Sequence, residues 1–294
     1  MFKTLLLIVN PKAGKRRSRS FFFDIFQVFS QAGYLIRLRL TAGPGDATRI
    51  AREEGGQFDL VVCYGGDGTL NQVTNGLLQL DSPPPVGYIA GGSTNDFAAS
   101  LQLPSDPAEA AQAIVESPGR YLDVGLFNGH HFMYVASFGA FTKASYSAPQ
   151  DLKNDLGHLA YIIEGIKDLS SLRSYRARVE ADGEVFDGKF LFGAVTNTLS
   201  LGGLVKLKSE DVVLDDGKFE MILFPEPKSL VDLNDMARAL LLQDYSGNGL
   251  IMRHASHVTV STEESLQWSL DGEREDAGRQ VEIQALHHRL FARM

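Results

Sequence analysis

The sequence predicts two domains, an α/β domain with a parallel sheet followed by a mostly antiparallel β domain. Short apolar runs alternate with helical patterns as far as about residue 121, which is typical of a parallel sheet covered by helices. Beyond that point strand-like segments dominate, and an Asp182-Gly183 pair between two of them signals a hairpin. The length of 294 residues fits about two average domains.

In the first domain, nearly continuous apolar runs predict buried strands, and apolar residues at three- or four-residue spacing predict helices. The expected strands are 5–9, 34–40, 58–64 and 86–90. The expected helices are 18–32, 45–54, 69–78 and one that begins near residue 95.

In the second domain, the expected strands are 122–127, 131–138, 175–181, 189–196, 218–224, 254–261, 266–270 and 280–286. Two helices interrupt them, 152–169 and 230–242. The first of these helices is expected to pack in the core or to line a cleft for acyl chains. We set the domains at 1–122 and 123–286 and leave open a return of 287–294 to the first.

Composition and charge narrow the classes of function. The 28 Lys and Arg residues against 36 Asp and Glu residues give a net charge of -8, so no broad electrostatic attraction to nucleic acid is expected. No apolar run approaches the about 20 residues of a membrane-spanning helix. Cys63 is the single cysteine and fits a reducing compartment. We expect a cytoplasmic protein that contacts membranes only through its surface.

A glycine-rich turn, Gly65 to Asn71, carries the strongest functional signal. It leaves a buried strand and enters an amphipathic helix, the place where open α/β sheets bind ligands. Glycines there let backbone N–H groups approach phosphates, and the helix N-terminus attracts negative charge. Asp67 beside phosphates would hold a cation, and magnesium with a nucleotide is the obvious candidate. A simple structural turn is the alternative.

Two further turns have the same position at strand ends. The segment 10–14 is followed by basic residues and fits a phosphate clamp or a solvated loop equally well. The segment 92–96 places small and hydroxyl residues before a helix, which capping alone would explain. Three such turns at one sheet edge favour a nucleotide site.

Together, the segments 10–14, 65–71, 92–96 and Asp271-Gly272-Glu273 resemble the diacylglycerol kinase catalytic-domain family, in the same order along the chain. The resemblance implies a Rossmann-like N-terminal domain related to NAD kinases and 6-phosphofructokinases, and a C-terminal β-sandwich. It also implies that ATP and a lipid meet between the two domains, with Mg²⁺ as cofactor. A homodimer is a family-level expectation.

The resemblance assigns roles to individual residues. The nucleotide contacts it implies are Asn10, Pro11, Lys12, Ala13, Gly14, Thr41, Gly65, Gly66, Asp67, Gly68, Thr69, Leu70, Asn71, Gln72, Ser93, Thr94, Asn95 and Asp96. Ser93 stands where relatives have threonine, and Ala90 and Ala99 replace a usual proline and arginine. Glu273 is the implied general base, Asp271 assists through magnesium or water, and Asp67 helps to neutralise the transferred phosphate.

A second metal is implied in the loop at 213–218. The ligands would be the Asp216 side chain and the backbone carbonyls of Val213 and Lys218, holding a structural magnesium away from the nucleotide. A hairpin turn would explain the same residues.

These inferences converge on an ATP-dependent lipid kinase, with diacylglycerol as the expected acceptor and phosphatidic acid as product. It would act peripherally at a membrane surface. An NAD-type kinase of small molecules and a catalytically silent nucleotide- or lipid-binding regulator are the alternatives.

Overall fold

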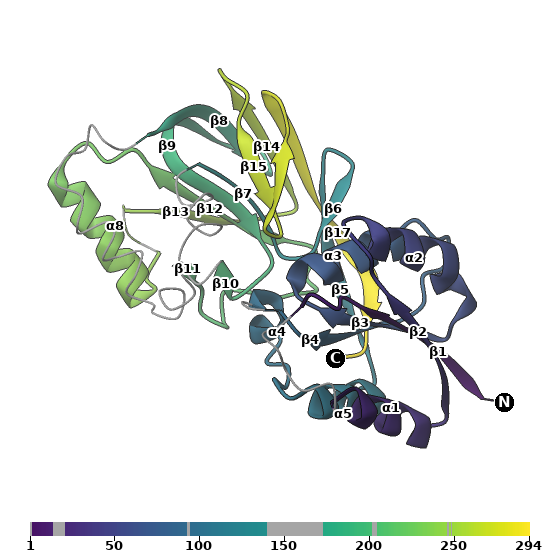
Figure 1. Ribbon diagram of the computed structural model, residues 1–294. Helices are drawn as coiled ribbons and strands as arrows, with labels where there is room; N and C mark the ends of the chain where they lie inside the picture. Colours follow the sequence, from purple (N-terminus) through teal and green to yellow (C-terminus); the bar gives the residue numbers. More distant parts are fainter. Residues whose placement is uncertain are drawn as a thin grey trace. The chain divides into compact units, whose positions relative to one another are not determined.

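The computed structural model describes residues 2–13, 21–92, 95–139, 173–201, 205–245, 247 and 249–294. The chain divides into two compact units (Figure 1). The first unit comprises the residues up to Leu122 together with His288–Met294, and the second comprises Asp123–His287.

The first unit contains a parallel sheet whose strands lie in the order β2, β1, β3, β4. Their bounds are β1 (Lys3–Val9), β2 (Tyr34–Leu40), β3 (Leu60–Gly65) and β4 (Val86–Ala90). The end of β17 (Gln280–Ala292) adds to this sheet, because Ala292 pairs in parallel with Val86. Every residue of β3 is buried, as the continuous apolar run predicts.

Helices cover both faces of this sheet (Figure 1). α1 (Phe21–Gln31) and α5 (Pro107–Glu116) pack together on one face, where Ile25, Phe29 and Ile114 enter the core. The opposite face carries α2 (Asp46–Glu54) and α3 (Asp67–Leu77), with the short η1 (Gly55–Gln57) and α4 (Asp96–Ser100) completing the unit. The predicted α/β architecture is therefore confirmed.

Helix α5 is missing from the sequence prediction although its start carries a recognisable signal. Asp106 caps it by accepting hydrogen bonds from the backbone N–H groups of Ala108 and Glu109, and Pro107 occupies the first helical position. Both are typical of a helix N-terminus.

The second unit is built from antiparallel strands. They lie in the order β16, β15, β7, β9, β8, β14, β17, and β12 pairs with β9 and β13. Their bounds are β5 (Arg120–Phe127), β6 (His130–Phe132), β7 (Val135–Gly139), β8 (Tyr175–Ala181), β9 (Glu184–Thr196), β12 (Phe219–Pro225), β13 (Ile251–Ala255), β14 (His257–Thr262), β15 (Gln267–Leu270) and β16 (Glu273–Asp276). β10 (Ser200–Leu201) and β11 (Val205–Lys206) form a small separate pair. Trp268 lies in the core against Phe127 and Phe138.

The structure corrects several predicted strands. The segment 131–138 is two strands rather than one, because the backbone N–H groups between them donate to Asp271. The segment 254–261 also divides, at Ser256, whose N–H and hydroxyl bind Asp182. A further strand, β16, was not predicted and follows the Asp271-Gly272 turn, whereas the predicted strand 280–286 is part of β17, which pairs with β14.

Other predictions in this unit hold. The Asp182-Gly183 hairpin joins β8 to β9, with φ of 46° and 91° at its two residues. The helix α8 spans Leu230–Leu242 as predicted. The predicted helix at 152–169 lies outside the described residues. None of the helices within the described ranges has both the length and the hydropathy to cross a bilayer.

Candidate active site

Three turns follow the carboxyl ends of β1, β3 and β4 in the first unit. Because these strands are parallel neighbours, their ends lie at one edge of the sheet. Backbone hydrogen bonds join the turns at their starts: Asn10 N–H donates to the carbonyl of Tyr64 at 2.9 Å, and Gly91 N–H donates to the carbonyl of Gly65 at 2.7 Å. The sequence inference that these segments share an edge is correct.

Asn10 links the first turn to helix α3. Its side-chain Nδ2 donates to the Thr69 hydroxyl at 3.0 Å, and its Oδ1 accepts from the backbone N–H of Lys12. Both Lys12 and Pro11 are exposed. The asparagine therefore fixes the turn's backbone on α3 and presents its basic residue to solvent.

Asp67 is a buried carboxylate at the first residue of α3. Its Oδ1 accepts from the Tyr88 hydroxyl at 3.1 Å, and its Oδ2 accepts from the backbone N–H of Asp96 at 2.8 Å. Burial, with the nearby Asp67 carboxylate as a second cause, raises the pKa of Tyr88, so the phenol stays a proton donor. Asp67 thus ties the second turn to the start of α4, where Asp96 is also buried.

Glycines allow the second and third turns to touch. A Cβ on Gly92 would lie 2.6 Å from the Cα of Gly66, closer than real side chains come. Asn95 closes the third turn by accepting from the N–H of Gly92 at 2.9 Å and donating to its carbonyl at 3.0 Å. The backbone of Asn95 is left-handed, with φ of 53°. The other residues predicted in these turns, Gly14, Ser93 and Thr94, lie outside the described residues.

The start of α3 has the features of an anion site. The N–H groups of Thr69 and Leu70 bind the carbonyl of Gly66. Among the described residues, the N–H groups of Gly66 and Gly68 have no acceptor. Such amides at a helix N-terminus suit phosphate oxygens.

Four other residues predicted to contact the nucleotide make hydrogen bonds or packing contacts within the first unit. Gln72 accepts from the N–H of Gly45 at 3.2 Å, and Thr41 N–H donates to the carbonyl of Val9 at 2.9 Å. The side chain of Leu70 is buried in the core, and Asn71 accepts from the side chain of Asn75. The loop after β2 is therefore tied to the same helix.

The second unit carries the other predicted carboxylates on the β15–β16 turn. Asp271 is buried and accepts three backbone hydrogen bonds: from Met133 at 2.6 Å, Tyr134 at 2.9 Å and Val135 at 3.0 Å. Asp271 and Gly272 have φ of 47° and 90°, typical of a two-residue hairpin turn. Glu273 follows directly, is exposed and opens β16. Asp271 thus anchors the turn that presents Glu273.

The loop at 213–218 is held by Asp123, which sequence reasoning did not single out. The Asp123 N–H donates to the carbonyl of Leu214 at 3.0 Å, and its Oδ2 accepts from Gly217 N–H at 2.6 Å. Asp216 Oδ1 accepts from Lys218 N–H at 2.9 Å, and among the described residues its Oδ2 carries no hydrogen bond. Asp123 lies near the start of the predicted apolar strand 122–127, and a carboxylate inside such a strand is the signal that could have marked it.

The donor set of this loop fits a hard cation. One carboxylate oxygen and two backbone carbonyls, those of Val213 and Lys218, would leave room for water, as magnesium prefers. In the described parts of the chain, no three His, Cys, Asp or Glu side chains converge into a metal site of their own. A cation bound here would therefore be coordinated mainly by backbone oxygens and water.

Tyr88 is the residue of the first unit that sequence reasoning missed. It lies in the buried strand β4, and its hydroxyl binds Asp67. A tyrosine inside a strand buried on both faces needs a partner for its O–H, which was the available signal.

Comparison with known proteins agrees with this geometry. A family model described as "Diacylglycerol kinase catalytic domain" matches residues 4–127. A diacylglycerol kinase of Bacillus subtilis (strain 168) is 37% identical over 273 residues, covering 92% of this chain and 90% of the relative. One of Staphylococcus haemolyticus (strain JCSC1435) is 34% identical over 275 residues, covering 93% and 83%.

Solved structures from Bacillus anthracis str. Sterne show the same fold. One superposes with a TM-score of 0.85 at 26% identity, covering 99% of this chain and 95% of the other. A second, a diacylglycerol kinase, gives a TM-score of 0.77 at 25% identity and covers 99% and 97%.

The fold and these relatives define a kinase that transfers a phosphoryl group to an alcohol. More particularly, the chain belongs to the diacylglycerol kinase catalytic-domain family and is a lipid kinase.

Proposed function

We propose that this chain transfers the γ-phosphate of ATP to the free hydroxyl of diacylglycerol, giving phosphatidic acid and ADP. The observation that carries the proposal is the placement of Asp67, fixed by Tyr88 and by the N–H of Asp96 at the start of α3. It sets a carboxylate beside the glycine amides that suit phosphate. We infer diacylglycerol as the acceptor because the relatives are named diacylglycerol kinases.

In this proposal the first unit binds the nucleotide. The amides of Gly66 and Gly68 would contact phosphate oxygens, with Lys12 available to add positive charge. Magnesium bound with the nucleotide would neutralise charge on the phosphates, and Asp67 is the side chain best placed to hold it. The hydrogen bonds from the Tyr88 hydroxyl and the Asp96 N–H hold the Asp67 carboxylate in a fixed position.

The second unit would supply the general base. The exposed Glu273 carboxylate takes the proton of the acceptor hydroxyl, whose oxygen attacks the γ-phosphorus. The bond to the β–γ bridging oxygen breaks, and ADP leaves with that electron pair. For this step the carboxylate must come within about 3 Å of the hydroxyl. Asp271 would position the turn, since its oxygens hold the backbone at 133–135.

The loop at 213–218 would hold a second, structural magnesium through Asp216, Val213 and Lys218. Among the described residues, Oδ2 of Asp216 accepts no hydrogen bond and could bind the cation. Asp123 already fixes the loop, so the cation would complete a largely preformed turn.

An acceptor panel tests the function. The purified chain is incubated with ATP labelled on the γ-phosphate, with magnesium, and with mixed micelles containing diacylglycerol, a sphingoid base or phosphatidylglycerol, or with soluble NAD. Label is expected in phosphatidic acid, with the Asp67→Asn variant at least about a hundredfold slower. Arg52→Gln, on the exposed side of α2, is the matched control and is expected to keep full activity.

Two results would overturn the proposal. If label is found in another lipid or in NAD and none in phosphatidic acid, the acceptor is that molecule and not diacylglycerol. Binding of ATP without transfer to any acceptor would instead favour the silent regulator.

A further inference from the structure

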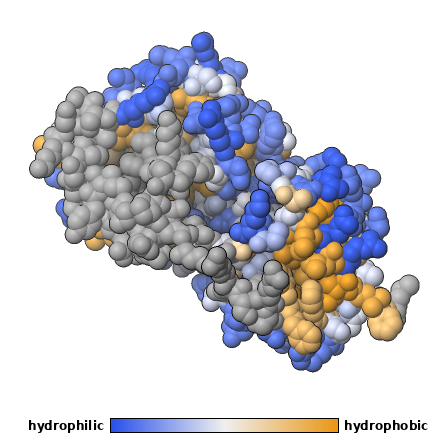
Figure 2. Space-filling view, viewed as in Figure 1, coloured by the Kyte–Doolittle hydropathy of each residue, from blue (hydrophilic) through white to orange (hydrophobic). Residues whose placement is uncertain are grey.

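Helix α8 exposes an unusual amount of apolar surface for its length. Its large hydrophobic side chains that are 48–66% exposed are Leu230, Val231, Leu241 and Leu242. Among the described side chains, α1 carries one exposed residue of this kind, Phe23, and α2, α3 and α5 carry none. Figure 2 shows hydrophobic surface at the left margin of the view, where Figure 1 draws α8. Such a concentration of exposed apolar side chains indicates a contact surface.

These side chains lie on one side of the helix, as one apolar pair at each end. Residues eleven positions apart on an α-helix lie within about 20° of each other around the axis and about 16 Å apart along it. Val231 therefore lines up with Leu242, and Leu230 lines up with Leu241. The opposite side of the helix is held in the second unit by four buried side chains: Leu233, Met236, Ala237 and Leu240. A flat surface can therefore touch both apolar pairs at once.

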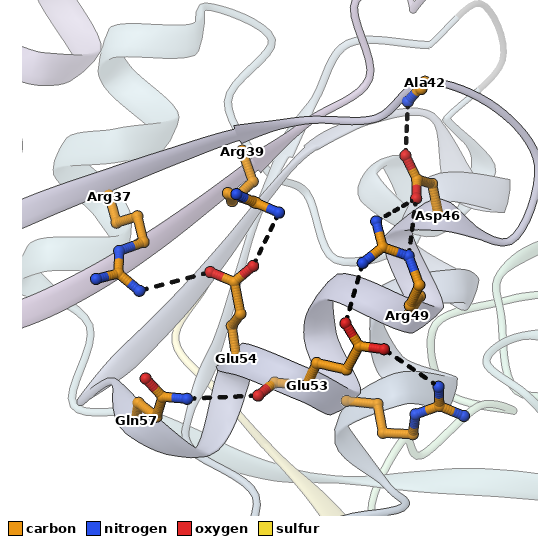
Figure 3. Close-up of polar contacts among 9 residues, drawn as sticks. Arg37, Arg39, Ala42, Asp46, Arg49, Glu53, Glu54 and Gln57 are labelled. Atoms are coloured by element: carbon orange, nitrogen blue, oxygen red, sulfur yellow. Dashed lines mark hydrogen bonds and ion pairs between the residues drawn. The ribbon is translucent and has the colours of Figure 1, made fainter.

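The exposed side of α8 also carries a positive charge without a partner in the chain. Arg238 lies between the two apolar pairs, within about 20° of Val231 around the axis. In the part of the chain that the structure describes, Arg238 forms no ion pair. Arg49 on the exposed side of α2 differs, because Asp46 and Glu53 bind it at 2.6 Å and 3.0 Å (Figure 3). The charge of Arg238 is therefore available to an anionic partner.

The acids of α8 do not cancel this charge. Asp232 accepts hydrogen bonds from the backbone N–H groups of Lys228 and Ser229 at 2.7 Å and 3.1 Å, so its carboxylate faces the start of the helix. The positive end of the helix dipole offsets a carboxylate in that position. Asp235 is the one acid among the exposed residues of α8, and the exposed Lys228 balances it. A small positive charge therefore remains on this side.

We propose that α8 lies on the surface of a bilayer that contains anionic phospholipid, with its two apolar pairs among the acyl chains and Arg238 at the phosphates. An amphipathic helix in this position buries its apolar side about 5–10 Å deep. The stem of an arginine can lie along apolar surface while its guanidinium reaches a phosphate. The inference rests on the proposed function, because a lipid acceptor is what requires the enzyme to approach a bilayer.

A bilayer fits this surface better than another protein does. Seven residues of α8 are exposed, whereas a stable protein interface uses about 20–30 residues on each side. A single amphipathic helix is enough for reversible attachment to a membrane. Anionic headgroups also attract the unpaired Arg238.

Co-sedimentation with vesicles tests the apolar contact. The full chain is mixed with vesicles of phosphatidylcholine and phosphatidylglycerol in equal parts. Leu242→Gln should weaken binding at least about fivefold, because one leucine no longer enters the acyl chains. Val185→Gln is the matched control, since Val185 is 40% exposed on β9 of the same unit. Its variant should bind the vesicles as the wild type does.

Vesicles of different charge test the role of Arg238. Arg238→Gln should weaken binding to the anionic vesicles about fivefold, because one cation fewer faces the lipid phosphates. Its binding to vesicles of phosphatidylcholine alone should stay at the wild-type level. Arg49→Gln is the matched control, because it removes the same formal charge from α2. It should change neither measurement.

Tryptophan fluorescence locates the contact on the helix. The natural Trp268 is the single tryptophan of the chain and is buried. Val231→Trp and Leu242→Trp should each be quenched by vesicles whose lipids carry bromine on their acyl chains. Val185→Trp should keep its fluorescence in the same vesicles.

Activity separates this inference from the proposed function. Leu242→Gln should slow transfer to diacylglycerol in vesicles, and it should leave transfer to a short-chain diacylglycerol dispersed in water unchanged. If the wild type binds vesicles through α8 but phosphorylates no diacylglycerol, the proposed acceptor is wrong and the contact surface stands.

Any of four results would overturn the proposal. These are a wild-type chain that does not bind the anionic vesicles, a Leu242→Gln variant that binds them as tightly as the wild type, quenching of Val185→Trp as strong as that of Leu242→Trp, and a change of oligomeric state in Leu242→Gln without a change in vesicle binding.

Discussion

Replacing Asp271 by asparagine separates two roles for this carboxylate, positioning of a turn and direct participation in chemistry. The carboxylate is 3% exposed and accepts backbone N–H groups at 2.6, 2.9 and 3.0 Å. Asparagine keeps one acceptor oxygen, which can serve Tyr134 and Val135. Its amide group faces the N–H of Met133, so that donor loses its partner inside the protein.

The expected loss of stability follows from these bonds. Two charge-assisted hydrogen bonds become neutral ones, at about 1 kcal/mol each, and one buried donor is left unsatisfied, at about 1–3 kcal/mol. Removal of a buried charge offsets part of this sum, which leaves about 3 kcal/mol. For a unit of this size the melting temperature should fall by about 6–12 °C.

Thermal unfolding followed by circular dichroism measures this change, with Glu273→Gln as the matched control. Glu273 is exposed on the same turn, so its variant should melt within about 1 °C of the wild type while losing activity. If Asp271→Asn melts with the wild type and loses only activity, Asp271 is not the anchor of the turn.

Three further perturbations test other contacts. Tyr88→Phe removes the 3.1 Å hydrogen bond to Asp67 and should reduce stability by about 1 kcal/mol and the transfer rate about tenfold; unchanged kinetics would contradict the role of this bond. Gly92→Ala should weaken ATP binding at least about tenfold in calorimetry, because its Cβ would press on the β3–α3 turn, whereas Gly43→Ala has open space and should not. Burial raises the pKa of Glu220 from 4.5 to about 9. The folded state therefore favours the protonated carboxyl, and the free energy of unfolding falls progressively as the pH rises from about 4.5 toward 9. The side chain in Glu220→Gln stays neutral, so the free energy of unfolding of this variant should exceed that of the wild type by an amount that grows by up to about 1.4 kcal/mol per pH unit between pH 6 and 8. Urea unfolding in the presence of a metal chelator measures this difference. A difference that does not change with pH would refute the raised pKa of Glu220.

The regular elements of this chain are predictable from sequence where their pattern is local. The bounds of β2, β4 and α8 agree with the apolar periodicity of their own residues. Packing against a sheet or a core reinforces what each segment already favours. Interruptions caused by distant residues are not predictable in this way. Asp271 divides 131–138, and Asp182 divides 254–261, through side chains far away in sequence.

The candidate site follows the same division. Strand ends and glycines locate three turns at one edge, because parallel strands bring their carboxyl ends together. The ties between the turns depend on the register of neighbouring strands. The bond from Asn10 to Thr69 and that from Tyr88 to Asp67 therefore required the structure. A hairpin turn and a catalytic turn also share the sequence Asp-Gly-Glu, so the anchoring role of Asp271 could not be read from residue types.

The variant Glu273→Gln separates nucleotide binding by the first unit from phosphoryl transfer, because both can be measured on the same protein. If the first unit binds ATP and Glu273 acts as the general base, calorimetry should give a dissociation constant for ATP within about twofold of the wild type. Transfer of label to diacylglycerol in a single turnover should then be slower by about 10²–10⁴. Transfer of label by Glu273→Gln at the wild-type rate would show that Glu273 is not the general base.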